Sequence, residues 1–289
     1  MPRAKAGLTG QAKKAAGLHS RRNRERYGQI LVEGPQAVRE LLARPELVRD
    51  LYVTEEGLSR HPDLDELAGR VDPYTHVLSD SDFARLSTAA QGWLAVAETP
   101  RQPSLERVLA GGPRLLVCLV ESADPGNLGT IIRSADAAGA DAVLLGPGSV
   151  EVYNPKVIRS SAGSVFHLQI LSLGVEDAVA IVRAAGIQVL CADGRGQWDL
   201  ADLMARPEDN PRPVTPGSQV PDLTAPTMWL VGNEAHGFTP AQLRLADHRV
   251  GIPMWGLAES LNAGVASSLC LYASALVQRA GRPGPGSAQ

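Results

Sequence analysis

The sequence contains few aromatic residues and no long hydrophobic run. Aromatic residues make up 4% of the 289 residues and hydrophobic residues of all kinds 44%, so the core must consist mainly of Ala, Val, Leu and Ile. No segment approaches the ~20 uncharged apolar residues that a membrane-spanning helix needs. The basic N-terminus is not followed by the apolar stretch of a secretory signal. These absences predict a cytoplasmic protein that does not span a membrane.

The sequence also lacks the cysteine pairs of a disulfide scaffold. Its three cysteines, Cys118, Cys191 and Cys270, each lie in an apolar run with no second cysteine nearby. That pattern is typical of buried small hydrophobic side chains. Neither the cysteines nor the six scattered histidines show the paired spacing of a zinc site, so we expect no metal.

Several common catalytic motifs are missing. There is no G-x-x-x-x-G-K-[ST] phosphate loop and no G-x-S-x-G nucleophile elbow. The two glycine pairs that resemble a dinucleotide fingerprint, Gly146-Pro-Gly148 and Gly194-Arg-Gly196, lack the third glycine. These absences argue against a nicotinamide-dependent oxidoreductase on a Rossmann sheet.

Charge is distributed unevenly along the chain. Residues 1–26 carry eight basic side chains against the single acid Glu25, which gives +7, so the remaining chain carries −10. A basic arm on an acidic body fits a polyanion partner, since each Lys or Arg that neutralises a phosphate releases counterions. A solvated tail without a partner is the alternative. We expect residues 1–20 to form a flexible basic arm.

Hydrophobic patterning predicts a small α/β domain over residues 21–98, followed by a Pro- and Gly-containing linker over residues 99–112. Short apolar runs alternate with amphipathic segments through the small domain. We expect strands over 29–32, 48–54, 77–78 and 93–96, and helices from Pro35, over 64–67 and over 80–86.

A second, larger α/β domain is predicted over residues 113–281, with a flexible tail over 282–289. Residues 115–120 are wholly apolar, as in a parallel strand buried on both faces. A segment with six prolines, residues 207–226, interrupts the pattern and is expected to lie outside the core. Expected strands are 115–120, 142–145, 166–171, 187–192, 227–231 and 249–252, and expected helices are 127–138, 155–162, 175–185, 240–245 and 261–280.

Three polar segments follow predicted strands of this domain, at the sheet edge where open parallel sheets bind ligands. In the first, Asp124–Asp136, we expect Asn127 to be a helix N-cap. Asn127, Thr130 and Arg133 fall on one helix face, where an arginine is able to grip a phosphate or ribose oxygen. Taken alone, the segment is better explained as a capped helix with a solvent-exposed arginine.

The second segment, Val231–Gly237, places Gly232 at a strand end, followed by the polar side chains of Asn233 and Glu234. The third, Ile252–Asn262, runs through a glycine-containing loop into the last helix. Ser260 is its expected N-cap. Taken alone, the second segment is better explained as an ordinary polar turn. The third fits a strand–helix connector about as well as it fits a ligand-binding loop.

Together and in this order, the segments resemble the three motifs of the SpoU, or TrmH, family of RNA ribose 2′-O-methyltransferases. Those motifs read N-x-G-x-x-x-R, G-N-E-x-x-G and I-P-M-x-G…S-L-N. They correspond here to Asn127–Arg133, Gly232–Gly237 and Ile252–Asn262. The chain is also similar to the family's connecting stretch and to its substrate-binding domain at Tyr153–Ser164, Ile30–Gly34 and Gln91–Val96.

The resemblance implies an α/β fold in which a C-terminal parallel-sheet domain with a deep trefoil knot, of the SPOUT type, follows a smaller α/β substrate-binding domain. It implies S-adenosyl-L-methionine as the cofactor, a homodimer, and RNA as the substrate, with ribosomal RNA favoured over transfer RNA because of the N-terminal domain. The implied catalytic residue is Arg133. The residues that line the site with it are Asn127, Glu234, Ser260 and Asn262, and the implied cofactor-binding residues are Gly232, Ile252, Met254, Leu261 and Asn262.

Other interpretations remain open at this point. The same reaction on transfer RNA, an antibiotic-resistance methylase of the same family, and a non-catalytic RNA-binding protein of ribosome assembly all fit parts of the sequence. Arg133 is able to act as an orienting group, through the adjacent phosphate, or as the base. The departures from the family pattern are Trp255, where a small residue is usual, and the long Pro-rich segment. The wide apolar arc of the last helix, with Val265, Leu269, Tyr272 and Leu276 in one stripe, favours a dimer.

Overall fold

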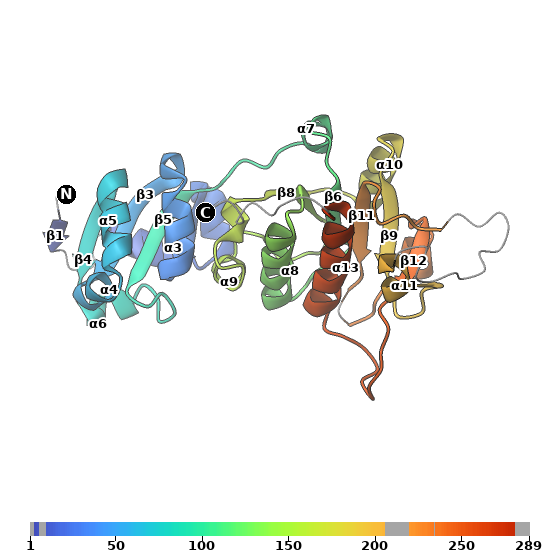
Figure 1. Cartoon of the computed structure of the whole chain (residues 1–289). Coiled ribbons are helices and arrows are strands. Elements are labelled where there is room, and N and C mark those ends of the chain that lie inside the picture. Colours follow the sequence, from blue (N-terminus) through green and yellow to red (C-terminus); the bar gives the residue numbers. More distant parts are fainter. Residues whose placement is uncertain (1–2, 6–9, 206–219, 234, 281–289) are drawn as a thin grey trace. The chain divides into compact units, whose positions relative to one another are not determined.

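The computed structural model describes residues 3–5, 10–205, 220–233 and 235–280. It divides into two compact units (Figure 1). The first contains the N-terminal residues to Arg101, and the second contains most of the chain after it. The sequence predicted two contiguous domains separated at 99–112. The structure corrects this boundary, because Leu128–Arg133 and Val150–His167 belong to the first unit.

The first unit contains a five-stranded mixed sheet. Its order is β1 (Arg3–Lys5), β4 (Tyr74–Leu78), β3 (Val48–Thr54), β5 (Trp93–Glu98) and β2 (Gln29–Glu33). The β1, β4 and β3 strands are parallel, whereas β5 is antiparallel to both of its neighbours. Before Arg101, its α-helices are α1 (Gly10–Gly17), α2 (Arg21–Tyr27), α3 (Pro35–Leu42), α4 (Glu55–Arg60), α5 (Pro62–Val71) and α6 (Asp80–Ala84).

The expected flexible arm over residues 1–20 is corrected by α1. This helix packs on the sheet, and Ala12, Ala15 and Leu18 are buried in one cluster with Tyr52 and other sheet residues. The small alanines lie on one side of α1 and the lysines on the other, exposed side. In the sequence, the lysines between these alanines make the short apolar stripe difficult to recognise.

Ion pairs attach the segment 150–167 to the N-terminal part of the first unit. Buried Arg24 donates to Glu151 from Nε at 2.9 Å and from Nη2 at 2.5 Å. Arg159 of α9 (Pro155–Ser160) donates at 2.5 Å to Glu33, which is buried at the end of β2. These contacts give the physical reason why the boundary expected from the sequence does not hold.

The second unit contains a seven-stranded sheet in which every pair of neighbouring strands is parallel. The order is β10 (Trp198–Asp199), β12 (His248–Gly251), β9 (Gln188–Ala192), β11 (Thr227–Val231), β6 (Leu115–Leu119), β7 (Ala142–Leu145) and β8 (Gln169–Ser172). All but the two-residue β10 were predicted, most of them within one or two residues.

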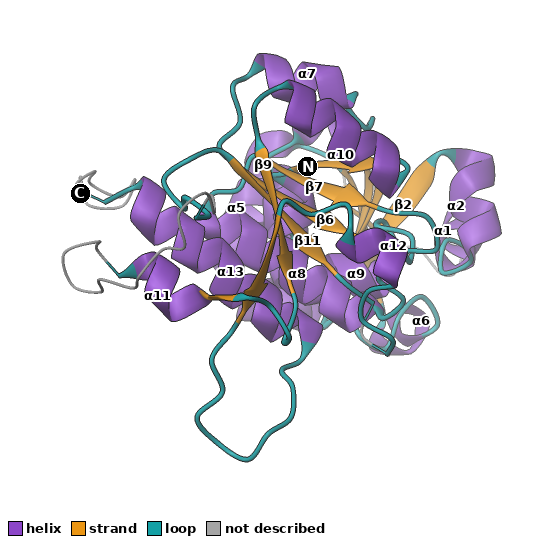
Figure 2. Ribbon diagram, turned by 90° about the vertical axis from the view of Figure 1, so that its right-hand side faces the viewer, coloured by secondary structure: helices purple, strands orange, loops and turns teal. Residues whose placement is uncertain are grey.

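Helices cover both faces of this sheet (Figure 2). Met228 and Leu230 of β11 point into a core that includes α7 (Leu105–Ala110) and α10 (Val175–Ala184), with α12 (Pro240–Leu243) packed against it. Trp229 points to the other face, where its indole nitrogen donates to Ser274 of α13 (Ala263–Gln278) at 2.9 Å. Helix α11 (Leu200–Met204) and the two ends of α8 (Pro125–Ala138) also belong to this unit.

The expected linker over 99–112 is partly helical. Leu105 and Val108 of α7 are buried in the core of the second unit, so only part of this segment serves as a connection. Of the Pro-rich segment, residues 206–219 lie outside the described residues, as does the expected tail over 282–289. Among the described residues, no helix is long and apolar enough to cross a membrane.

Candidate active site at the carboxyl edge of the parallel sheet

The three polar segments begin at one edge of the seven-stranded sheet. The register aligns Leu119, Val231, Ala192 and Val250 in a row across β6, β11, β9 and β12. The second segment begins in this row at Val231, the third begins two residues after it at Ile252, and the first begins five residues after it at Asp124. Because all four strands are parallel, their carboxyl ends share one edge, as expected from the sequence.

The first segment forms the start of α8. Asp124 caps this helix by accepting from the backbone N–H of Asn127 at 2.8 Å. The prediction that Asn127 is the N-cap was therefore wrong, because Pro125 starts the helix two residues earlier. The helix ends at Gly139, whose φ of 65° is the left-handed conformation that glycine favours at a C-cap.

The predicted amphipathic pattern of α8 is confirmed. Arg133 is exposed, as is Thr130 one turn before it, whereas Asn127 is half-buried. The buried side of the helix consists of Leu128, Ile131, Ile132 and Ala135. The arginine side chain is thus available to a ligand, and its helix is fixed by an apolar stripe.

The second segment is a tight turn directly after β11. Asn233 and Gly237 exchange backbone hydrogen bonds of 3.1 and 2.8 Å, and the side-chain oxygen of Asn233 accepts from the backbone N–H of Ala235 at 2.8 Å. A Cβ on Gly232 would lie 2.9 Å from the carbonyl carbon of Gly237, so only glycine permits this closure. Glu234 lies outside the described residues.

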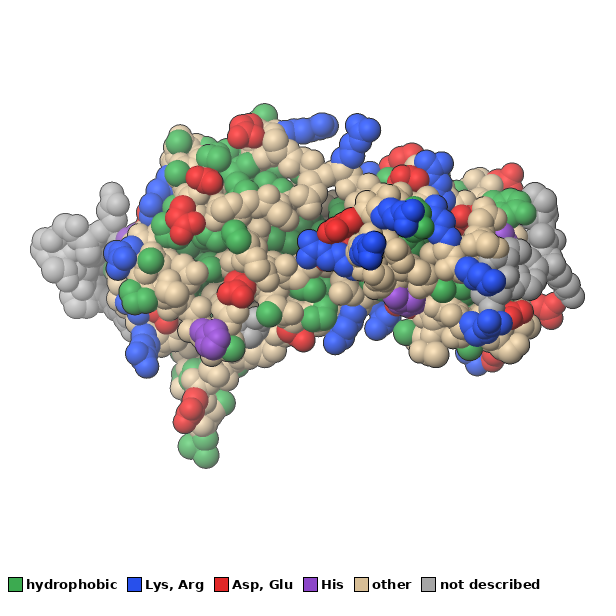
Figure 3. Space-filling model, turned by 180° about the vertical axis from the view of Figure 1, so that it is seen from behind, with side chains coloured by type: hydrophobic (Ala, Val, Ile, Leu, Met, Phe, Trp, Pro, Cys, Tyr) green, Lys and Arg blue, Asp and Glu red, His purple; other side chains and the backbone are tan. Residues whose placement is uncertain are grey.

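The third segment is a loop that projects from the sheet between β12 and α13 (Figures 1 and 3). Ile252 and Leu261, at its two ends, are half-buried. Met254 and Ser260 are exposed, and Trp255 is 88% exposed. Hydrophobic side chains gather at the end of the loop (Figure 3). Trp255 is the residue that departs from the family pattern.

Asn262, rather than Ser260, caps the last helix. Its side-chain oxygen accepts from the backbone N–H groups of Gly264 at 2.8 Å and Val265 at 3.4 Å. The prediction for Ser260 was wrong because the loop runs two residues further than the sequence indicated.

One side-chain hydrogen bond joins the first and third segments. The Nδ2 group of Asn262 donates to Oδ1 of Asn127 at 2.9 Å, between residues 135 positions apart in the sequence. Helix α13 continues beside α8, where the hydroxyls of Ser134 and Ser268 are 2.6 Å apart. The structure therefore brings Asn127 and Asn262 into direct contact, and it places Gly232 and Ile252 at the same sheet edge.

Sequence reasoning missed two acidic residues at this edge. Besides the cap Asp124, Asp193 follows β9 and accepts from Nε of Arg249 at 2.8 Å. This ion pair fixes the end of β12, from which the third segment begins. The position of Asp193 directly after a predicted strand was the available signal, since every strand end contributes to this edge.

In the described part of the chain, the cysteines supply no reactive thiol and no side-chain cluster supplies a metal site. All three thiols are buried, as predicted. Burial raises the pKa of Cys118 and of Cys191 to about 12, so neither is a nucleophile near neutral pH. The described residues contain no cluster of three or more His, Cys, Asp or Glu side chains able to hold a metal ion.

Comparison with known proteins identifies the family of the chain that carries this site. Residues 114–272 match the SpoU rRNA methylase family, and they include all three polar segments. The chain belongs to the SpoU rRNA methylase family. Residues 10–95 of this SpoU family member also match the MRM3-like substrate binding domain, a range that includes α1.

Relatives of this SpoU methylase carry specific names. It is 32% identical over 257 residues to the 23S rRNA (guanosine(2553)-2′-O)-methyltransferase RlmP of Bacillus subtilis, covering 88% of this chain and 92% of that protein. It is 37% identical over 195 residues to the 23S rRNA (uridine(2479)-2′-O)-methyltransferase of Streptomyces viridochromogenes, covering 65% and 61%.

A solved structure shares the fold. The SpoU methyltransferase AviRb from Streptomyces viridochromogenes, crystallised in complex with the cofactor AdoMet, superimposes with a TM-score of 0.73 at 32% identity. The match covers 92% of this chain and 98% of that chain.

Proposed function

We propose that this protein transfers a methyl group from S-adenosyl-L-methionine to a ribose 2′-hydroxyl of ribosomal RNA. The observation that carries the proposal is the hydrogen bond between Asn127 and Asn262. It joins the first and third motifs of the family at the edge where parallel sheets bind ligands. Family membership supplies the reaction class, and the joined motifs indicate that the site is intact.

The choice of ribosomal RNA rests on the relatives and on the N-terminal unit. The match to the Bacillus subtilis enzyme, a 23S rRNA methyltransferase by name, covers 88% of this chain. The match to a substrate binding domain over residues 10–95 supports an RNA-binding role for the first unit. We propose a cytoplasmic location, in line with the bacterial ribosomal RNA methyltransferase that the chain resembles.

The carboxyl edge fits S-adenosyl-L-methionine. The second and third segments present main-chain groups there, beginning at Gly232, where the backbone packs so closely that a Cβ would clash, and at half-buried Ile252. Such groups recognise an adenine edge and a ribose without charged side chains. We propose that the cofactor is held by Gly232, Ile252, Met254, Leu261 and Asn262. Bound there, it supplies an electrophilic methyl group on a sulfonium centre.

Arg133 is our catalytic assignment. Its exposed guanidinium presents several donors in a rigid fork, which suits a phosphate and the neighbouring ribose oxygen. Holding the 2′-hydroxyl in line and stabilising its developing negative charge lowers the barrier. Asn127 and Asn262, held by each other and by a helix cap, would position the surroundings, with Ser260 and Glu234 as further lining residues.

We also propose a homodimer and a deep trefoil knot. Four residues in the predicted apolar stripe of α13 stay exposed in the single chain: Val265 at 46%, Leu269 and Tyr272 at 43%, and Leu276 at 60%. A two-fold partner is able to cover this self-complementary patch. The return of the chain from β12 through a long loop to a helix beside α8 supports the knot.

Two measurements test the function. Isothermal titration calorimetry should detect stoichiometric binding of S-adenosyl-L-methionine to the purified protein. Incubation with methyl-labelled cofactor and unmodified ribosomal RNA should then place one label on a ribose 2′-oxygen, mapped by its resistance to alkaline cleavage. Absence of cofactor binding, or label on a base, would overturn the proposal. Label on transfer RNA alone would overturn the choice of ribosomal RNA.

A further inference from the structure

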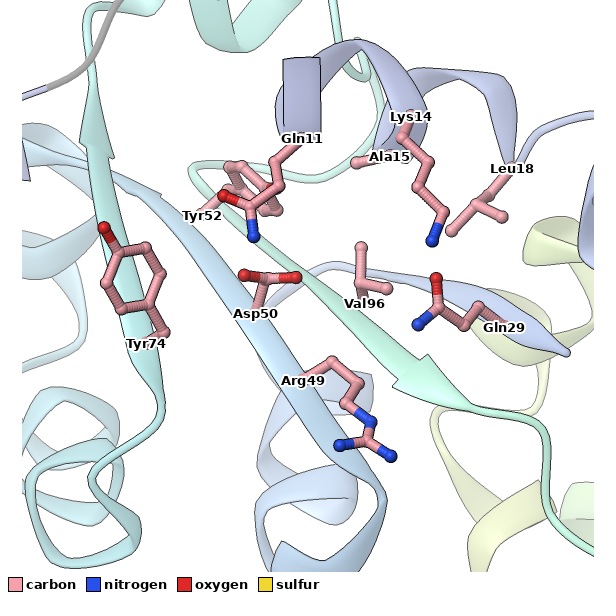
Figure 4. Close-up of a pocket in the computed structure, with 10 residues that line it drawn as sticks. All are labelled: Gln11, Lys14, Ala15, Leu18, Gln29, Arg49, Asp50, Tyr52, Tyr74 and Val96. Carbon is pink, nitrogen blue, oxygen red and sulfur yellow. The ribbon is translucent and has the colours of Figure 1, made fainter. Parts of the chain in front are cut away.

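A cavity of about 550 Å³ opens on the first unit between α1 and one face of the five-stranded sheet. It is separate from the residues assigned to methyl transfer. Figure 4 shows polar and aromatic side chains from α1 and from strands β2, β3, β4 and β5 surrounding one space. The lining residues that the argument uses are Lys14, Arg49, Asp50, Tyr52 and Tyr74.

One wall of the cavity is aromatic. Tyr52 and His76 are stacked with ring centroids 4.5 Å apart and planes 6° apart, and Tyr74 meets His76 edge-on at 4.7 Å. Tyr52 is 1% exposed, whereas Tyr74 is 48% exposed. The buried pair holds the wall rigid, and the exposed ring of Tyr74 offers a stacking surface. A base stacked on an aromatic ring gains about 1–3 kcal/mol.

The hydroxyl of Tyr52 is buried and has no hydrogen-bond partner among the described residues. Leaving such a group unpaired costs about 1–3 kcal/mol. Burial, with a further contribution from the Asp50 carboxylate, raises the pKa of Tyr52 far above its usual value, so the hydroxyl stays protonated as a donor. Because Tyr52 lines the cavity, an acceptor atom of a ligand that displaces the groups covering this hydroxyl would pair with it.

Each charged group around the cavity favours a different part of a ligand. The Asp50 carboxylate lines the cavity and has one oxygen 3.4 Å from Nε2 of His76, so it disfavours an anion inside and accepts from a donor. Lys14 lies 4.4 Å from the ring of Tyr27, and Arg49 is paired with Glu98 at 2.7 Å. Lys14 is therefore the cation available to a phosphate.

We propose that this cavity binds an unstacked nucleotide of the RNA substrate, with the base inside and its phosphate at Lys14. A nucleobase combines the features that the cavity selects: a flat face for Tyr74, an acceptor for the Tyr52 hydroxyl and an N–H donor for Asp50. Single-stranded RNA is commonly recognised through splayed bases of this kind. The proposal rests on the proposed function, because it takes RNA to be the substrate.

Binding of short RNA tests the cavity directly. The probes are fluorescein-labelled heptacytidylate and a heptamer with the same ribose–phosphate backbone but no bases, each titrated with the full-length protein by fluorescence anisotropy. The wild type should bind the base-containing probe at least tenfold more tightly. Tyr74→Ala and Tyr52→Phe should each reduce this preference about fivefold, while leaving affinity for the abasic probe unchanged.

Lys13 and Lys14 provide a matched pair. Both are exposed on α1, but only Lys14 lines the cavity. Lys14→Ala should weaken binding of both probes several-fold, because it removes a phosphate contact, and Lys13→Ala should have little effect. Equal losses from the two variants would show a diffuse basic surface and overturn the cavity. A Tyr52→Phe variant that keeps the full preference for the base-containing probe would also overturn the cavity proposal. The Tyr52 hydroxyl would then be paired with water rather than with a base.

The cavity and the methyl transfer fail in distinguishable ways. If the cavity proposal is wrong, the Tyr52→Phe and Tyr74→Ala variants will methylate ribosomal RNA with an unchanged KM. If the proposed function is wrong, the wild type will show no methyl transfer, whatever it does with the probes. Cofactor binding, measured by calorimetry, should be unchanged in every cavity variant and serves as the check that the second unit is folded. If the wild-type protein binds neither probe and binds a peptide instead, RNA is not the ligand of the cavity and the proposal is overturned.

Discussion

Asn262 donates a side-chain hydrogen bond to Asn127 at 2.9 Å while its own side-chain oxygen caps α13. One amide therefore serves two purposes. The oxygen fixes the start of the last helix, and the nitrogen attaches that helix to the start of α8. Two segments separated by more than a hundred residues in the sequence thereby share one rigid connection at the proposed active site.

Two substitutions at Asn262 separate these purposes. Asn262→Ala should lower the free energy of unfolding by about 1–2 kcal/mol, since a lost N-cap costs about that amount. Asn262→Asp keeps an acceptor at the helix N-terminus and should retain most of the stability. Both variants lose the bond to Asn127, so both should weaken cofactor binding. Urea denaturation and calorimetry measure the two effects, and equal stability in the two variants would contradict the cap assignment.

Arg133→Ala should reduce methyl transfer by at least about a hundredfold, the loss expected when a group that stabilises developing charge is removed. Cofactor binding should remain nearly unchanged, because Arg133 lies on α8 and not in the segments assigned to the cofactor. Arg107→Ala, an exposed arginine on α7, is the control. Labelled-methyl transfer to ribosomal RNA is the measurement. A rate for Arg133→Ala close to that of the wild type would refute the catalytic assignment.

The basic N-terminal segment contains two kinds of arginine. Arg24 is buried and donates to Glu151 and to two backbone carbonyls, so Arg24→Ala should cost about 3 kcal/mol of stability. Exposed Arg22 is free to meet phosphate, so Arg22→Ala should leave stability unchanged and reduce the salt slope of RNA binding by about 1. Thermal unfolding and salt titrations of RNA binding distinguish the two. The same salt effect from both variants would contradict this division.

A charge in the exposed stripe of α13 should separate the proposed dimer. We expect Leu269→Glu to shift the species seen in light scattering from twice the chain mass to 30.5 kDa and to reduce methyl transfer. Met204→Glu, at an equally exposed hydrophobic residue on α11, should leave the dimer intact. A wild type that is active at the single-chain mass would refute the dimer.

The buried thiols predict a loss of stability at alkaline pH. The pKa of Cys118 and of Cys191 is about 12 in the folded protein, above the value near 8.5 of an exposed thiol. Above pH ~8.5 the unfolded chain loses these protons while the folded chain keeps them, so the free energy of unfolding falls as pH rises toward 12. A thiol reagent at pH 8 should modify none of the three cysteines in the folded protein and all three in denaturant. Rapid modification of the folded protein would contradict their burial.

Much of the fold could be predicted from the sequence, because local residue patterns determine it. The runs at 115–119 and 228–231 are wholly apolar, a pattern typical of a strand buried on both faces. The position of each polar segment after a predicted strand was equally local. Since parallel strands end at one edge, their convergence followed from the sequence alone.

Other features depended on contacts between distant residues. The three lysines of residues 1–20 and the basic residues near them suggested a flexible arm. In the structure, Ala12, Ala15 and Leu18 are instead buried against a face of the sheet. The segment at 150–167 belongs to the first unit because Glu151 and Arg159 find ion-pair partners more than a hundred residues away. Asn127 and Ser260 are good N-cap types, but the true caps are Asp124 and Asn262. Where several residues are able to cap a helix, packing of the whole chain decides which one does, because local preferences differ by only about 1 kcal/mol.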